Sequence, residues 1–137
     1  MRFQHQTQFV TDNEGKLGNC FFACLCSLLD VDLASAPIPT VRDEMWRQFR
    51  AFALLHGYRL IQVSTDGLVA WGLEDATLIA GGLSPRQPFE DELISHAVLW
   101  RNGEVVFDPH PDGTGLDGEP HTLYFLTPEP TGPEETR

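Results

Sequence analysis

The longest apolar run of this chain covers residues 20–29, with the sequence Cys-Phe-Phe-Ala-Cys-Leu-Cys-Ser-Leu-Leu. It contains no charged residue, no glycine and no proline, so a helix built from it would be apolar on nearly every face. A short helix that is apolar all round is buried in the protein core. Asn19 precedes the run and is a good N-cap residue, which predicts a buried helix that begins at Cys20.

A second stretch has the spacing of an amphipathic helix. Its apolar stripe consists of Met45, Trp46, Phe49, Phe52, Ala53 and His56. Thr40 is expected to cap this helix, with Asp43 in the capping-box position three residues later. Gly57 is expected to end it, since glycine is the preferred residue just beyond a helix C-terminus.

Segments of β-branched, aromatic and alternating residues predict a sheet in the rest of the chain. Strands are expected at 58–63, 77–80, 94–100, 104–108 and 121–126, and residues 3–10 are expected to form a short extended segment. Together with the helices, these strands predict an α+β fold. In it, the buried N-terminal helix packs on a mostly antiparallel sheet of about five strands.

Glycine and proline mark the connections and the end of the domain. Residues 81–86, Gly-Gly-Leu-Ser-Pro-Arg, are expected to form a tight loop, with the lining of a substrate cleft as the alternative. From Thr127 the composition is dominated by proline, glutamate, threonine and glycine, with nothing to bury. We therefore expect one folded domain over residues 1–126 and a disordered tail over residues 127–137.

Acidic residues outnumber basic ones by twenty to nine, which gives a formal net charge of −11. Nucleic acid and anionic membrane surfaces would be repelled by this charge, so we expect neither as a partner. No apolar stretch approaches the roughly 20 residues that a membrane-spanning helix needs. The first residues lack the apolar core of a signal peptide, and we therefore expect a cytoplasmic protein.

Three cysteines, Cys20, Cys24 and Cys26, lie within seven positions of one predicted helix. This arrangement cannot form a disulfide framework and suits a reducing compartment. Buried cysteines usually act as small hydrophobic residues, which is the role expected of Cys24 and Cys26. Cys20 differs because unpaired N–H groups and the positive end of the helix dipole favour the thiolate at a helix N-terminus. Its position predicts a nucleophile, and a structural role for all three cysteines is the alternative.

A hairpin with its turn at residues 102–103 determines whether Asp108 can reach His96. A two-residue Asn-Gly loop would place His96 opposite Pro109 and turn Asp108 to the other face of the sheet. A three-residue loop over residues 101–103 would make His96 and Asp108 direct cross-strand neighbours. We expect the second register, in which the carboxylate can orient the imidazole.

The order of four short motifs resembles the papain-like thiol hydrolases. Within them the likeness is closest to the small bacterial double-glycine (bacteriocin-leader) peptidases and to phage and bacterial proteins of that fold. The motifs are Gln6-Thr7, Gly18-Asn19-Cys20-Phe21-Phe22-Ala23-Cys24-Leu25, His96-Ala97-Val98-Leu99 and Asp108-Pro109. The likeness covers residues 5–30 and 79–116.

The resemblance implies a role for each matching residue. Cys20 would attack a carbonyl as a thiolate, and His96 would hold it as an ion pair and then protonate the leaving amine. Asp108 would fix the imidazole tautomer and stabilise its charged form. The oxyanion would bind the N–H of Cys20 and the amide of Gln6 or of Gln8, of which we prefer Gln6.

These residues predict a cysteine-dependent acyl-transfer hydrolase that acts on a peptide or protein substrate through a thioester intermediate. Peptidases, isopeptidases and glutamine deamidases use the same groups, so the bond that is cleaved stays open. A catalytically silent protein-binding module on the same fold, with a stable protein partner, is the alternative from another class.

No cofactor or metal ion is expected. Asp108, His110 and Asp112 are close in sequence, but they lack the spacing of metal ligands. The spacing of Cys20, Cys24 and Cys26 is not that of a zinc site either. His96 is therefore expected to act as the catalytic base, with His110 as the alternative.

Overall fold

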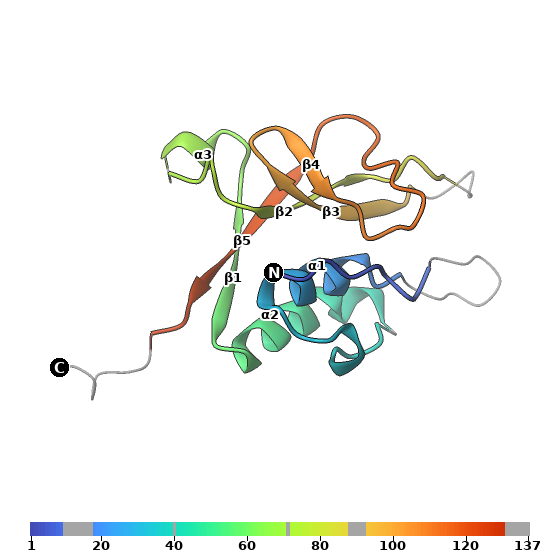
Figure 1. Cartoon of the computed structure of the whole chain (residues 1–137), viewed down its shortest axis with the longest axis vertical. Helices are drawn as coiled ribbons and strands as arrows, with labels where there is room; N and C mark the ends of the chain where they lie inside the picture. Colours follow the sequence, from blue (N-terminus) through green and yellow to red (C-terminus); the bar gives the residue numbers. More distant parts are fainter. Residues whose placement is uncertain (10–17, 40, 71, 88–92, 131–137) are drawn as a thin grey trace.

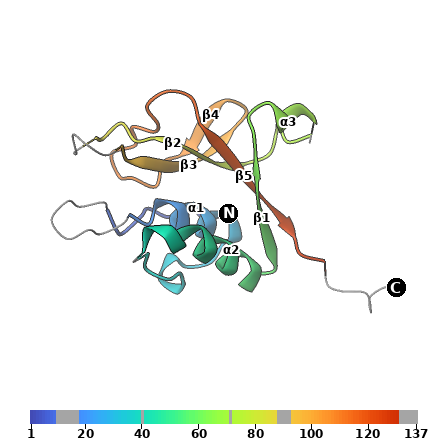
Figure 2. The same cartoon turned by 180° about the vertical axis from the view of Figure 1, so that it is seen from behind.

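Two helices pack on one face of a five-stranded sheet in the computed structural model, which describes residues 1–9, 18–39, 41–70, 72–87 and 93–130 (Figures 1 and 2). Within these residues the elements are α1 Cys20–Leu29, η1 Leu33–Ser35, η2 Arg42–Glu44, α2 Met45–Leu55, β1 Tyr58–Val63, α3 Gly67–Ala70, β2 Leu78–Leu83, β3 Ser95–Arg101, β4 Glu104–Phe107 and β5 Thr122–Pro128.

The strand order is β1-β5-β2-β3-β4, and every neighbouring pair is antiparallel. The predicted α+β class is therefore confirmed, with the N-terminal helix packed on an antiparallel sheet of five strands. The central position of β2 and β3 matters for the site, because residues of both strands line a cavity with Cys20 of α1.

The two faces of the sheet carry separate apolar clusters. On the helix side, Phe22 and Leu25 of α1 are fully buried against α2 and against Ile79 and Leu99 of the sheet. On the opposite side, Leu78 and Val98 pack under the segment that contains α3. Helix α1 is thus enclosed as its composition predicts, because seven of its ten residues are buried.

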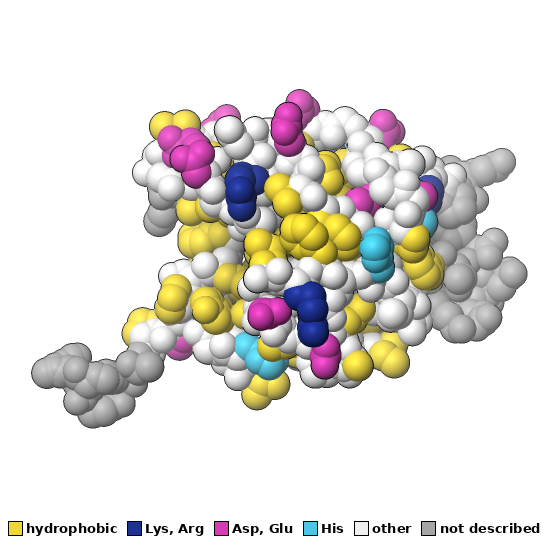
Figure 3. Space-filling view, in the orientation of Figure 1, with side chains coloured by type: hydrophobic (Ala, Val, Ile, Leu, Met, Phe, Trp, Pro, Cys, Tyr) yellow, Lys and Arg dark blue, Asp and Glu magenta, His cyan; other side chains and the backbone are white. Residues whose placement is uncertain are grey.

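Residues 3–9 lie between α1 and the β4 edge of the sheet and form no strand. Gln4 donates its backbone N–H to Ser27 Oγ of α1 at 3.0 Å, and Gln6 donates its own to the carbonyl of Pro109 at 2.9 Å. Phe3 stacks on Phe107 of β4, with ring centroids 4.8 Å apart. Figure 3, drawn in the orientation of Figure 1, shows hydrophobic side chains exposed near the middle of the molecule, between the sheet and the helices. The expectation of a short extended segment over residues 3–10 is not tested by these contacts, and residue 10 lies outside the described residues; residues 4–6 connect α1 to the loop after β4.

The second helix begins later than its sequence indicates. The 3-10 turn η2 precedes it, α2 starts at Met45, and the expected cap Thr40 lies outside the described residues. Phe49, Phe52 and Ala53 of the predicted apolar stripe are buried. Gly57 follows the helix at a φ of +85°, which is the left-handed conformation expected of a terminating glycine.

The loop prediction for residues 81–86 is wrong in its first half, because β2 continues through Gly81 and Gly82 to Leu83. Gly82 pairs with His96 of β3, and a Cβ there would lie 3.3 Å from a methyl group of Leu116. A Cβ on Gly81 would lie 3.0 Å from Thr122 Oγ1. The glycines therefore allow close approach of neighbouring chain segments within a strand, where composition alone indicates a turn.

The expected register of the β3–β4 hairpin is also wrong. Arg101 pairs with Glu104, so the loop has two residues, and Asn102 and Gly103 adopt φ values of 51° and 86°. A bulge then shifts the register, so that Trp100 pairs with Val105 but Leu99 pairs with Phe107. Continued by one pair, the shifted register turns Asp108 to the face of β3 that carries His96. Asp108 then lies opposite Val98, two residues from His96, so the two side chains share a face without being the direct cross-strand pair that a three-residue loop was expected to give.

The last strand extends beyond residue 126, where its end was predicted. Strand β5 runs to Pro128, where it pairs with Tyr58, and Glu129 forms an ion pair with Arg59. Proline is tolerated there because β2 pairs with β5 only as far as Tyr124, which leaves the other side of the strand unpaired. Residues 131–137 of the predicted tail lie outside the described residues.

Candidate active site

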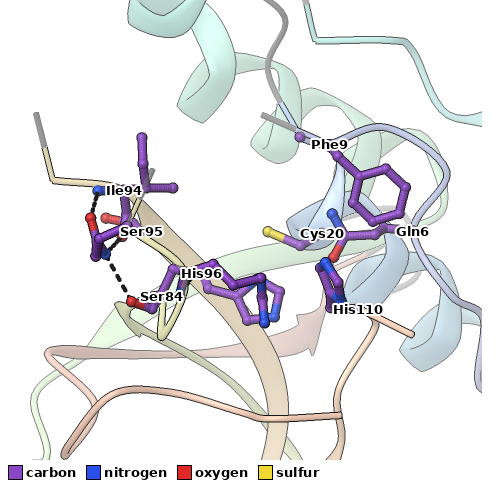
Figure 4. Close-up of a pocket in the computed structure, with 11 residues that line it drawn as sticks. Gln6, Phe9, Cys20, Ser84, Ile94, Ser95, His96 and His110 are labelled. Carbon is purple, nitrogen blue, oxygen red and sulfur yellow. Dashed lines mark hydrogen bonds between the residues drawn. The ribbon is translucent and has the colours of Figure 1, made fainter. Parts of the chain in front are cut away.

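Cys20 is the first residue of α1 and is partly exposed, whereas Cys24 and Cys26 are 0% exposed. Its sulfur points into a pocket, on the side where the His96 ring lies (Figure 4). Burial raises the pKa of Cys24 well above the ordinary value, with smaller contributions from Cys20 and Asp108. Burial, together with the charge of Asp32, raises the pKa of Cys26 to about 11. Of the three thiols, Cys20 is the one placed to react.

Asn19 occupies the N-cap position of α1, but its side chain does not cap the helix. Instead Asn19 Oδ1 accepts the backbone N–H groups of Thr7 and Gln8, at 2.9 and 2.8 Å, and Nδ2 donates to Thr7 Oγ1. The predicted capping role is therefore corrected, because the amide holds the N-terminal segment against the start of the helix. This contact places Gln6 beside Cys20.

His96 and Asp108 form a buried pair. The distance from His96 Nε2 to Asp108 Oδ1 is 2.7 Å, and the two side chains are 4% and 3% exposed. Because Nε2 is bonded to the carboxylate, Nδ1 is the ring nitrogen left for Cys20. The residues expected to form a triad are thus brought together at the mouth of α1.

The carboxylate of Asp108 is also held by the loop that follows it. Its Oδ1 accepts the backbone N–H of His110 at 2.9 Å, and its Oδ2 accepts that of Gly115 at 2.7 Å. Burial alone would raise the pKa of Asp108, but these bonds and the one from His96 lower it. Asp108 is therefore an anion at neutral pH and has a fixed orientation.

The protonation of His96 follows from its neighbours. Burial disfavours the charged ring, but hydrogen bonds to Asp108 and Cys20 and the charges of both groups outweigh burial and raise the pKa of His96 to about 9. At neutral pH the ring is an imidazolium. An imidazolium beside Cys20 stabilises a thiolate and has a proton to give to a leaving group.

Gln6 is 7% exposed and lines the same pocket as Cys20 and His96. Its Nε2 donates to the carbonyl of Gln8 at 2.9 Å, while its Oε1 is buried and has no hydrogen-bond partner among the described residues. Gln8 is not among the residues that line the pocket. The structure thus places Gln6 in the same pocket as the expected nucleophile, Cys20, with one of the two amide protons of Gln6 bonded to the carbonyl of Gln8.

Two cavities meet at Cys20, Ser95 and His96, which line both. The first, of about 400 Å³, is called the polar cavity because most of the residues that line it are polar types; its remaining lining residues are Gln6, Phe9, Gly18, Ser84, Arg86, Gln87, Ile94 and His110. The second, of about 350 Å³, is mainly apolar, and its remaining lining residues are Phe21, Met45, Phe49, Gly81, Gly82, Ala97, His121, Thr122 and Tyr124. A substrate that reaches Cys20 therefore has space on both sides of the sulfur.

Residues of the 81–86 segment do line the cleft, although half of the segment is strand rather than loop. Arg86 is held at the rim of the polar cavity by Asp112, whose carboxylate accepts from Arg86 Nη1 at 2.9 and 3.0 Å. The aromatic wall from Phe49 and Tyr124 was missed by the sequence analysis. Its only sequence signal is the apolar stripe of α2, which equally describes a core helix.

Among the residues that the structure describes, no group of three or more His, Cys, Asp and Glu side chains could hold a metal ion. In the same part of the chain, no helix has both the length and the apolar character to span a membrane.

A scan against protein-family models found no match, and neither did searches of curated proteins and of solved structures.

Proposed function

We propose that this protein is a cysteine-dependent acyl-transfer hydrolase of the papain-like kind, acting on an amide or isopeptide bond of a peptide or protein. One observation carries the proposal. Cys20, at the mouth of a buried helix, shares a pocket with His96, and the His96 ring is bonded to Asp108 at 2.7 Å. A thiol, an imidazolium and an oriented carboxylate in this order are the groups that thiol-dependent acyl transfer needs.

The reaction begins with attack of the Cys20 thiolate on the substrate carbonyl carbon. The new C–S bond forms as the carbonyl π electrons move to oxygen, and the resulting oxyanion is stabilised by N–H donors around the start of α1. His96 gives its proton to the amine nitrogen, the C–N bond breaks and the amine leaves. His96, now neutral, takes a proton from the water molecule whose oxygen attacks the thioester; the C–S bond breaks, the acid is released, and the Cys20 thiolate and the His96 imidazolium are restored. Asp108 keeps the ring oriented throughout.

A catalytically silent binding module is the second candidate, and one observation favours it. Gln6, the expected oxyanion donor, donates one amide N–H to Gln8 and has an oxygen without a partner among the described residues. Only one of the two amide protons of Gln6 is then left to donate to an oxyanion. The alternative predicts a stable complex with a protein partner and no acylation of Cys20.

The proposal is tested first by the alkylation rate of each cysteine in the native full-length protein, measured against pH and mapped by mass spectrometry. We expect Cys20 to react with iodoacetamide at least about 100-fold faster than Cys24 or Cys26, because burial protects the other two. His96→Ala should slow the reaction of Cys20 about tenfold near pH 6.5, because the imidazolium partner is lost.

His56→Ala is the matched control, since His56 lies at the far end of α2 and does not line the pocket. It should leave the alkylation rate of Cys20 unchanged. A Cys20 rate that is the same in wild type and His96→Ala at every pH would contradict the proposed pair. A positive result justifies a peptide screen, in which new amino termini report peptidase activity and ammonia release from glutamine reports deamidation.

A further inference from the structure

His110 lines the polar cavity together with Cys20 and Gln6 (Figure 4). The proposed hydrolysis gives it no role. The Asp108 carboxylate that orients His96 also binds the backbone N–H of His110. One carboxylate therefore holds the ring of His96 and the backbone of His110, and the centroids of the two rings are 6.3 Å apart. Phe9 packs edge-on against the His110 ring at 5.1 Å.

The hydrogen bonds of His110 determine which nitrogen carries its proton. The backbone N–H of Asp112 donates to His110 Nδ1 at 3.1 Å, and a nitrogen that accepts must keep its lone pair. The neutral ring therefore has its proton on Nε2. For this nitrogen the structure records no partner among the described residues, so its N–H is free to meet a group in the cavity.

The Asp112 carboxylate lies 3.2 Å from Nδ1 and would favour a charged ring if it had no other partner. Its Oδ1 already accepts from Arg86, from the backbone N–H of Thr114 and from the Thr114 hydroxyl, each at 3.0 Å. Burial and the charge of Arg86 lower the pKa of His110, and the nearby Asp112 and Asp108 carboxylates only partly oppose this. The ring is neutral at neutral pH.

We propose that His110 is a further catalytic residue, which donates its Nε2–H to the oxygen of the reacting carbonyl and completes the oxyanion hole. This inference rests on the proposed function. Gln6 contributes at most one amide proton beside Cys20, because the other is bonded to Gln8, and its buried oxygen has no donor among the described residues. A neutral imidazole held in one tautomer is a suitable electrophile for a developing oxyanion, because it donates a hydrogen bond without carrying a charge of its own.

The test compares two reactions of the same thiol in the full-length protein. Acylation of Cys20 by p-nitrophenyl acetate passes through a tetrahedral oxyanion, whereas alkylation by iodoacetamide is a direct displacement without one. His110→Phe keeps an aromatic ring but removes the donor. We expect it to slow the p-nitrophenolate burst about 100-fold, as expected for loss of one oxyanion donor, while alkylation changes by less than about twofold. His110→Gln, which restores an N–H donor, should recover part of the acylation rate.

Nitrogen-15 NMR of the wild-type imidazole rings gives a readout that does not depend on reactivity. We expect the His110 ring at neutral pH to show a protonated Nε2 and an unprotonated Nδ1. The inference is overturned if the proton is on Nδ1, if His110→Phe acylates at the wild-type rate, or if both reactions slow equally. If wild-type Cys20 is not acylated at all, the proposed function fails together with the inference. Unchanged acylation in His110→Phe overturns only the inference.

Discussion

Two His–Asp pairs lie next to Cys20, one buried and one at the rim of the polar cavity. In the buried pair, His96 Nε2 is 2.7 Å from Asp108 Oδ1, and the side chains are 4% and 3% exposed. In the rim pair, His110 Nδ1 is 3.2 Å from Asp112 Oδ1, and the side chains are 22% and 38% exposed. The residue types are the same, yet the pKa values of the two histidines shift in opposite directions.

The difference comes from the other bonds of each carboxylate. Asp108 is held by neutral backbone N–H groups, so its charge is available to His96, whose pKa rises to about 9 despite burial. Asp112 is neutralised by Arg86, and the pKa of His110 is lowered by burial and by Arg86. An aspartate close to a histidine therefore does not predict an imidazolium. The remaining partners of the carboxylate determine the outcome.

The largest expected effect is on the free energy of unfolding when each carboxylate is removed. Asp108→Ala leaves a buried imidazole and two backbone N–H groups without an acceptor, and should destabilise the protein by about 3–5 kcal/mol. Asp112→Ala removes the carboxylate of the exposed rim pair and should cost less than about 1 kcal/mol. Urea unfolding followed by circular dichroism measures both. Equal losses would show that the two pairs do not differ as described.

The second effect is the pH dependence of the buried pair. The pKa of His96 is about 9 in the folded protein, against an ordinary value of 6.5 for an unfolded chain. The charged His96 ring therefore stabilises the folded protein fully below pH 6.5, and this stabilisation is lost as the pH rises through 9. The stability difference between wild type and His96→Gln should shrink by about 2–3 kcal/mol between pH 6 and pH 10. Urea midpoints at several pH values test this. A difference that stays constant with pH would mean that His96 is not charged in the folded protein.

The smallest effect is at the rim pair. Arg86→Gln removes a cation beside His110 and frees the Asp112 carboxylate, so the pKa of His110 should move up towards the ordinary histidine value. The pKa of His96 should change much less, because Arg86 is not among the groups that shift it. NMR titration of the two ring signals measures both in one sample. A His110 pKa that stays where it is would exclude Arg86 as a cause of its lowering.

Local patterns in the sequence were sufficient for most elements of the fold. The apolar run from Cys20 to Leu29 predicted α1, and the alternating segment from Tyr58 to Val63 predicted β1 with its observed bounds. The signals failed where neighbouring segments changed what a residue does. Gly82 lies within strand β2, where glycine leaves room for Leu116 to pack in the space that a side chain would fill. Asn19 is not a cap because its amide binds Thr7 and Gln8.

For the site, residue type, order and local context were enough to select Cys20, His96, Asp108 and Gln6 as candidate residues. Their arrangement could not be derived in this way. Asp108 reaches His96 through a bulge after a two-residue turn, and the residues of the turn do not indicate that bulge. The opposite behaviour of His96 and His110 depends on carboxylate partners that are distant in sequence, such as Arg86 for Asp112.

The amino-acid sequence was enough to establish that a cysteine starts a buried helix in an acidic α+β domain, because helix burial and strand alternation are properties of short segments. The folded chain was needed to establish which nitrogen of each histidine faces which partner, and which histidine is charged. Those properties depend on burial and on hydrogen bonds between segments far apart along the chain. Such contacts exist only once the sheet, the two helices and the N-terminal segment have come together.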